Sequence, residues 1–136
     1  ALDEAGLPFD ESLVLHSDYY IPTAYEAAGQ LTGLDVTGVL ATSDNIALGV
    51  LKRLYEEGRR VPRDYSVVSY DNSAADSLFE PALTSIEQNV GELSEAAIGL
   101  ILQRLDEYAR GEEGKGPQER LLTPRLVLKD SVRELG

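Results

Sequence analysis

The sequence of 136 residues has no cysteine, no tryptophan and a single histidine, His16, to which we assign no role. The absence of cysteine excludes disulfides, thiolate metal sites and a cysteine nucleophile, and it suits a reducing cytoplasm, where we expect the protein to act. No apolar run approaches the roughly 20 residues that a membrane-spanning helix needs, and the first residues do not have the pattern of a signal peptide. We therefore expect no membrane partner.

Positively charged residues are also scarce, since 12 Lys and Arg stand against 24 Asp and Glu and leave a net charge of -12. Nucleic acid is a dense polyanion, so we do not expect this chain to bind DNA by itself. The sequence also lacks the phosphate-binding motifs Gly-x-Gly-x-x-Gly and Gly-x-x-x-x-Gly-Lys-Ser and the nucleophile elbow of hydrolases. These absences predict no enzymatic activity, no cofactor and no metal.

The composition is that of one folded domain, with 43% hydrophobic residues. Short β-branched runs alternate with longer stretches of helical period, which predicts an α/β fold with a parallel sheet. We expect strands at 13–16, 36–41, 65–70 and 83–86, and a less regular edge strand within 121–132. We expect helices at 22–31, from an N-cap at Ser43 to just before Gly58, and from an N-cap at Asn89 onward.

The helix that follows Asn89 repeats apolar residues at helical spacing. We expect it to bury Val90, Leu93, Ala97, Leu100, Ile101, Leu105 and Tyr108. The stretch 111–116 has three glycines and two glutamates and is expected to be an exposed turn. Residues 1–8 have the pattern of a last helical turn that stops at Gly6 and is followed by Pro8, so we expect the sequence to begin inside a domain.

Polar and aromatic residues follow each predicted strand. Ligands bind open parallel sheets at the carboxyl ends of the strands, where helix N-termini and loop side chains converge. The residues at these positions are Ser17, Asp18, Tyr19 and Tyr20, then Thr42, Ser43 and Asp44, then Asp71 and Asn72, and finally Glu87, Gln88 and Asn89. Carboxylates and amides bind hydroxyl groups, and an aromatic ring covers the C–H face of a pyranose. This mixture predicts a sugar or another polyol as the ligand.

Each of these residues also has a purely structural alternative. Ser43 and Asp44 are of the types that cap helices, and Asp71 is followed by two polar residues in a pattern typical of an Asx turn. Tyr19 and Tyr20 are adjacent, and neighbouring side chains of extended backbone point to opposite sides. Only one of the two rings is therefore expected to line a cleft.

Four segments occur in a defined order along the chain. They are Ala-Thr-Ser-Asp-Asn-Ile-Ala-Leu-Gly at 41–49, Gly-Arg-Arg-Val-Pro-Arg-Asp-Tyr-Ser-Val-Val-Ser-Tyr-Asp-Asn at 58–72, Pro-Ala-Leu-Thr-Ser-Ile-Glu-Gln at 81–88 and Pro-Arg-Leu-Val-Leu-Lys-Asp-Ser at 124–131. Together they resemble the C-terminal effector-binding region of LacI/GalR-type repressors. The resemblance implies a periplasmic-binding-protein-like fold of two lobes, with this chain as a three-layer α/β sandwich around a parallel sheet. We expect residues 1–136 to form one partial effector-binding domain, without the helix-turn-helix and the N-terminal lobe.

The resemblance also implies roles for single residues. Asp71 corresponds to the carboxylate that contacts the effector, and Tyr19 corresponds to the aromatic residue that packs on it. Gln88 and Tyr20 match positions that contact ligand in some members. Ser43 stands where the family usually has an asparagine amide, and its shorter side chain reaches different ligand hydroxyls.

A homodimer is implied as well, with the helix that carries Leu48 and Lys52 and the loop around Phe79 at the contact. The alternative for Phe79 is an anchor within the core or the loop. The implied function is that of the effector-sensing region of a LacI-type repressor, in which a sugar modulates operator binding and only the N-terminal domain binds DNA. Two alternatives stay open, which are the sugar-binding protein of an ABC transporter and an α/β enzyme.

Overall fold

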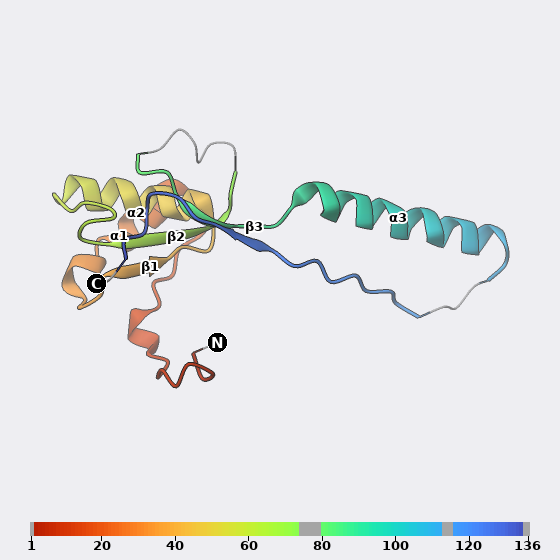
Figure 1. Cartoon of the computed structure of the whole chain (residues 1–136), viewed down its shortest axis with the longest axis horizontal. Helices are drawn as coiled ribbons and strands as arrows, with labels where there is room; N and C mark the ends of the chain where they lie inside the picture. Colours follow the sequence, from red (N-terminus) through yellow and green to blue (C-terminus); the bar gives the residue numbers. More distant parts are fainter. Residues whose placement is uncertain (1, 74–79, 113–115, 135–136) are drawn as a thin grey trace.

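The computed structural model describes residues 2–73, 80–112 and 116–134. Its centre is a four-stranded sheet with the strands in chain order. β1 (Gly38–Leu40), β2 (Ser66–Asp71) and β3 (Thr84–Glu87) are parallel, and β4 (Arg125–Val127) runs antiparallel to β3 (Figure 1). The predicted α/β class, the parallel sheet and the strands expected within 36–41, 65–70, 83–86 and 121–132 are confirmed.

Two helices form where the sequence predicts them. α1 (Ile21–Ala28) ends earlier than expected, and a short 3-10 turn, η2 (Leu31–Gly33), begins at the last residue of the predicted helix. α2 (Asp44–Glu56) begins at the predicted cap, because the Oγ of Ser43 accepts a hydrogen bond of 3.2 Å from the backbone N–H three residues on. It ends before Gly58, whose φ of +73° is readily adopted only by a residue without a side chain.

α1 and α2 pack directly against each other and against the sheet. They approach closely at Gly49, where a Cβ atom would lie 2.7 Å from the Cβ of Ala24 and from two backbone atoms of α1. Both helices line one cavity together with β1, so they cover the same face of the sheet. The core beneath them consists of Ala28, Leu31, Ala41, Ala47, Val50, Leu54, Tyr65, Val67 and Leu83.

The opposite face of the sheet is more open. Val68 and Tyr70 of β2, which alternate with the buried Val67 and Ser69, are half-buried there, and Leu40 at the end of β1 is exposed. α1 and α2 with the sheet therefore make two layers. The third layer of the sandwich that the resemblance implies is not seen within residues 2–73, 80–112 and 116–134.

The strand predicted at 13–16 is wrong. A 3-10 turn, η1 (Glu11–Leu13), takes up its start, because the Oδ1 of Asp10 accepts hydrogen bonds from both the backbone N–H (2.9 Å) and the Oγ (2.7 Å) of Ser12. The residues after η1 are not part of the sheet. A cavity of about 260 Å³ lies between this segment, at Leu13 and Leu15, and the elements β1, α1 and α2.

A serine close to the described C-terminal end joins two neighbouring strands. The Oγ of Ser131 donates a hydrogen bond of 2.6 Å to the carbonyl of Val67 in β2 and accepts one of 2.7 Å from the N–H of Thr84 in β3. The carbonyl of Ser131 also accepts from the N–H of Val67 at 2.9 Å. Ser131 is fully buried, so the segment that follows β4 is hydrogen-bonded to both β2 and β3 in the interior of the protein.

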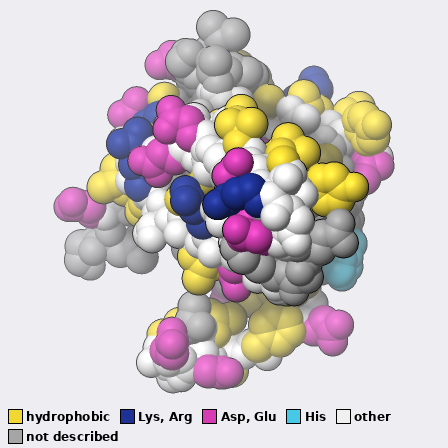
Figure 2. All heavy atoms as spheres, turned by 90° about the vertical axis from the view of Figure 1, so that its right-hand side faces the viewer, with side chains coloured by type: hydrophobic (Ala, Val, Ile, Leu, Met, Phe, Trp, Pro, Cys, Tyr) yellow, Lys and Arg dark blue, Asp and Glu magenta, His cyan; other side chains and the backbone are white. Residues whose placement is uncertain are grey.

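α3 (Val90–Ala109) begins at the predicted cap, where the side chain of Asn89 accepts from the N–H of Glu92 at 3.4 Å. Its predicted burial is wrong, because α3 projects from the edge of the sheet and stands apart from α1 and α2 (Figure 1). Leu100 is half-buried and Ala97 is exposed, and the other expected core residues, Val90, Leu93, Ile101, Leu105 and Tyr108, are 48% to 70% exposed. Figure 2, which views the molecule from the side on which α3 projects, shows hydrophobic side chains on the surface among the charged ones.

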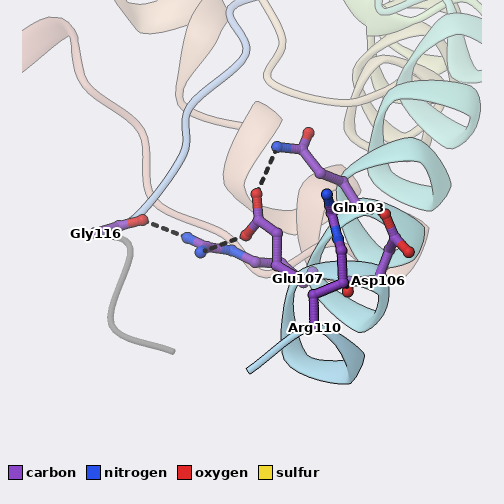
Figure 3. A network of polar contacts seen from close by, with 6 residues as sticks. Gln103, Asp106, Glu107, Arg110 and Gly116 are labelled. Atoms are coloured by element: carbon purple, nitrogen blue, oxygen red, sulfur yellow. Dashed lines mark hydrogen bonds and ion pairs between the residues drawn. The ribbon is translucent and has the colours of Figure 1, made fainter. Parts of the chain in front are cut away.

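The far end of α3 is held by a polar network (Figure 3). Glu107 is buried and accepts hydrogen bonds from the Nε2 of Gln103 at 2.9 Å and from a guanidinium nitrogen of Arg104 at 3.2 Å. Arg104 also donates to the carbonyl of Gly116, which ties the returning chain to the helix. Residues 113–115 of the turn predicted at 111–116 lie outside the described residues. No described helix is long and apolar enough to cross a membrane.

Candidate functional site

The candidate site lies at the carboxyl edge of the sheet. Because β1, β2 and β3 are parallel, the segments that follow them emerge at the same edge, next to the N-termini of α1 and α2. Several hydrogen bonds join these segments, among them those that connect Asp71 with Gln88, Tyr19 with Asn45, and Asp44 with Ser73. The expected gathering of polar groups at this edge is therefore observed.

Asp71 and Gln88 come together at the ends of β2 and β3. The Nε2 of Gln88 donates a hydrogen bond of 3.1 Å to the Oδ1 of Asp71, and Asp71 is exposed. An Asx turn at Asp71 would use the N–H of Ser73, which instead donates to the Oδ2 of Asp44 at 2.7 Å. The structural alternative for Asp71 is thus not seen, and its carboxylate faces solvent with one amide partner.

Tyr19 and Tyr20 lie where the chain enters α1. Their side chains are 66% and 72% exposed, so neither ring is part of the core. The carbonyl of Tyr19 accepts a hydrogen bond of 3.2 Å from the Nδ2 of Asn45, which sets the start of α1 beside the start of α2. The N–H of Tyr20 donates to the Oδ1 of Asp18 at 3.1 Å. The backbone of both residues is therefore held beside the start of α2.

The other residues singled out from the sequence lie on α2 or near it. Ser43 is buried and its Oγ caps α2, which is the structural alternative considered for it, while its contact with ligand stays a prediction. Leu48 is half-buried, and the exposed Lys52 pairs with Glu56 at 2.6 Å. Phe79 lies outside the described residues. The dimer contact expected at Leu48, Lys52 and Phe79 remains a prediction.

The sequence analysis placed Asp44 among the polar residues of this edge, with helix capping as the alternative, and did not predict its contacts with the strands. Asp44 is only 5% exposed, and its Oδ1 accepts hydrogen bonds from the Oγ atoms of Ser69 at 2.7 Å and Ser85 at 3.4 Å. Its Oδ2 accepts from the N–H of Ser73. A signal was present, because two buried strands carry serines at positions where apolar residues are usual, and a buried hydroxyl needs a partner.

Asn72 is fixed on its other side by charged residues. Its Nδ2 donates to the Oε1 of Glu87 at 3.3 Å, and its Oδ1 accepts from the Nζ of Lys129 at 2.7 Å. Arg125 in β4 also donates to Glu87. The hydrogen bond from Arg125 is the main reason that the pKa of Glu87 lies below its usual range, against the opposing effect of partial desolvation.

This edge can recognise hydroxyl groups. The carboxylate of Asp71 accepts hydrogen bonds, the amide of Gln88 both donates and accepts, and the exposed rings of Tyr19 and Tyr20 offer flat apolar surfaces. Among residues 2–73, 80–112 and 116–134, no group of three His, Cys, Asp or Glu side chains is placed to hold a metal ion.

Comparisons with known proteins agree with this architecture. The model of the family described as periplasmic binding protein-like domain matches residues 1–132. The HTH-type transcriptional repressor PurR of Glaesserella parasuis is 33% identical over 139 residues, which cover 100% of this chain and 41% of PurR.

Solved structures give the same result. A LacI family transcriptional regulator from Enterococcus faecium with bound ribose superposes with a TM-score of 0.82 at 30% identity, over 97% of this chain and 48% of the regulator. The transcriptional regulator CelR in complex with cellobiose gives a TM-score of 0.84 at 32% identity, over 96% of this chain and 39% of CelR. The chain thus spans less than half the length of these relatives. It belongs to the periplasmic binding protein-like domain family and corresponds to the C-terminal effector-binding region of LacI-type regulators.

Proposed function

We propose that this chain is the effector-sensing region of a LacI-type transcriptional repressor, and that a sugar or a similar small polyol binds at the carboxyl edge of its sheet. The observation that carries the proposal is the hydrogen-bonded pair of the exposed Asp71 and the half-buried Gln88, which lies at the same edge as the exposed residues Tyr19 and Tyr20. The solved structures with ribose and cellobiose support a sugar as the class of ligand. Ser43 is included in the proposed site as a hydroxyl at the start of α2.

The second wall of the proposed cleft belongs to the longer protein that the relatives represent. α3 leaves the sheet beside Gln88 and presents a row of exposed apolar residues along its length. We assign this row to packing against that second lobe, because a helix stripe of this kind is normally buried against another element. For the same reason we expect the chain alone to bind the effector weakly or not at all.

In this proposal, the effector acts by favouring one arrangement of the two lobes. It can change DNA affinity only by its difference in affinity for the two arrangements, which typically amounts to about 1–3 kcal/mol. The protein works in the cytoplasm as a homodimer, with α2 at Leu48 and Lys52 and the loop around Phe79 at the contact. A domain outside this chain binds the operator, which agrees with the net charge of -12 found here.

Thermal unfolding of the intact protein tests the ligand class. Ribose and cellobiose are the sugar probes, and guanine, a flat base without hydroxyl groups, is the contrasting probe. We expect a sugar to raise the midpoint of unfolding, because a ligand that binds only the folded state stabilises it. The Asp71→Ala variant should lose this shift. A protein that guanine stabilises and neither sugar does would contradict a polyol effector.

Binding to DNA from upstream of the protein's own gene tests the repressor. Fluorescence anisotropy of the labelled fragment should report binding by the intact protein, and the stabilising sugar should change the apparent Kd. The homodimer is tested on the same sample by measuring its mass in solution. A protein that does not bind this DNA, with or without sugar, would favour a transport binding protein instead.

A further inference from the structure

We propose that Asp44 is a positioning residue, whose buried carboxylate holds the turn after β2 so that Asp71 is presented to the effector. The inference rests on the proposed function, because it assumes that Asp71 binds the ligand. It adds a residue that does not itself reach the site. Asp44 is 5% exposed and lies at the start of α2, whereas Asp71 is exposed at the end of β2.

The turn after β2 has an unusual backbone. Asp71 has φ 110° and Asn72 has φ 53°, so two successive residues with side chains adopt conformations that glycine normally takes. Such conformations are costly and persist only where the surroundings impose them. Some group must therefore hold this turn in place.

Asp44 holds the two backbone N–H groups that follow Asp71, one directly and one through Ser85. The N–H of Ser73 donates directly to its Oδ2 at 2.7 Å. The N–H of Asn72 donates at 3.0 Å to the Oγ of Ser85, which in turn donates to the Oδ1 of Asp44 at 3.4 Å. One carboxylate thus fixes two consecutive peptide groups, directly and through one serine.

The carboxylate is not needed to cap its own helix. Ser43 supplies the side-chain cap of α2, and the side-chain partners of Asp44 lie on β2, β3 and the turn. A second set of hydrogen bonds, between the side chain of Asn72 and those of Glu87 and Lys129, holds the turn from its other side. The direction in which Asp71 points toward Gln88 is therefore set by the Asp44 contacts on one side and by the Asn72 contacts on the other.

The side-chain amide of Gln88 reports this direction. In the intact protein with ¹⁵N-labelled glutamine, its amide signals reflect the hydrogen bond to Asp71. We expect Asp44→Ala to move these signals toward their position in Asp71→Ala. Asp44→Asn should keep them near the wild-type position, because its amide oxygen can accept from Ser73 while its NH₂ group donates to Ser69. A folded Asp44→Ala protein with unmoved Gln88 signals would overturn the proposal.

A second variant decides the question if Asp44→Ala does not fold. Ser85→Ala removes the hydroxyl between Asn72 and Asp44 and leaves the contact of Ser73 intact. The proposal requires the Gln88 signals to move in this variant too, and unmoved signals would reject it. A role of Asp44 in stability alone would lower the unfolding midpoint in both variants without shifting these signals.

Affinity for ribose and cellobiose gives a second readout. Asp44→Ala should weaken binding by at least about tenfold, since small displacements of a binding group are costly. In the Asp71→Ala background, Asp44→Ala should have no further effect, whereas independent roles would give additive losses. If wild type binds neither sugar, the proposed ligand class fails, and the Gln88 signals still decide whether Asp44 positions Asp71.

Discussion

The side-chain amide of Gln88 donates a hydrogen bond to the carboxylate of Asp71 across 3.1 Å, although 17 positions separate the two residues in the sequence. The parallel pairing of β2 and β3 brings them together, because Asp71 lies opposite Glu87 in the register. One residue further on, Gln88 reaches back to the carboxylate. The pair is thus a product of strand register, and changes at either residue should act on ligand binding more than on the core.

Asp71→Gly should separate stability from binding. Glycine accepts φ 110° without strain, so the variant is expected to be at least as stable as wild type. The released strain can add at most about 1–3 kcal/mol to the free energy of unfolding. It also loses the carboxylate, so affinity for ribose and cellobiose should fall. Urea unfolding and calorimetric titration of the intact protein measure the two effects. Asp71→Ala, which keeps the strain, is the matched control, and a Gly variant less stable than the Ala variant would contradict the strain argument.

Gly49→Ala should destabilise the contact between α1 and α2. The new Cβ would lie 2.7 Å from the Cβ of Ala24 and from two backbone atoms, which cannot move independently of α1. Overpacking of this kind costs about 1–3 kcal/mol. Gly99→Ala is the control, because Gly99 is also helical and has nothing within 4 Å of the added atom. Thermal unfolding followed by circular dichroism should show a loss for Gly49→Ala alone, and equal midpoints would refute a close helix contact.

Ser131→Ala should weaken the junction of β2 and β3. The variant leaves the buried N–H of Thr84 and the carbonyl of Val67 without the hydroxyl that now joins them. An unsatisfied buried polar group costs about 1–3 kcal/mol, which urea unfolding resolves. Ser94→Ala removes an exposed hydroxyl that donates to the carbonyl of Val90, and its effect should stay within about 0.5 kcal/mol. Similar losses in both variants would mean that the position of Ser131 has no special importance.

Asp64 should make the free energy of unfolding depend on pH in the acidic range. Hydrogen bonds from Arg63, and then from the N–H of Arg60, lower the pKa of Asp64 from 3.8 to about 2. A carboxyl whose pKa is lower in the folded state stabilises the protein above its unfolded pKa, and this contribution is lost as the pH falls through the folded value. The loss is therefore expected between pH 3.8 and about 2. Carbon NMR of the Asp64 carboxylate should show a midpoint near the lower value, and Asp64→Asn should have a flatter stability profile over this range. A titration midpoint of the Asp64 carboxylate at its ordinary value of 3.8 would show that it makes no such contribution to stability.

The sequence predicted the parts of this fold that depend on neighbouring residues. Ser43 and Gly58 mark the ends of α2 because a cap and a left-handed stop act locally. The polar edge followed from the chain direction of parallel strands alone. Neither inference required knowledge of distant contacts.

The parts that were not predicted depend on contacts far along the chain. The partners of Asp44 lie 25 to 41 positions away, so no local pattern distinguishes it from an ordinary capping residue. The stretch 13–16 has the composition of a strand, yet the carboxylate of Asp10 favours a turn at its start. The apolar stripe of α3 shows that a helix needs a partner without showing where that partner is.

The antiparallel pairing of β3 with β4 makes the segment that contains α3 separable from the rest of the sheet. Glu87 and Arg125 are opposite each other in the register and form an ion pair, so the chain that departs at residue 88 returns at residue 124 to the same place. The segment between these two strands, which contains α3, therefore begins and ends at neighbouring positions of the sheet. A tight hairpin could replace it without moving any strand, and the shortened chain would be a minimal scaffold that carries Asp44, Asp71 and both tyrosines on one edge.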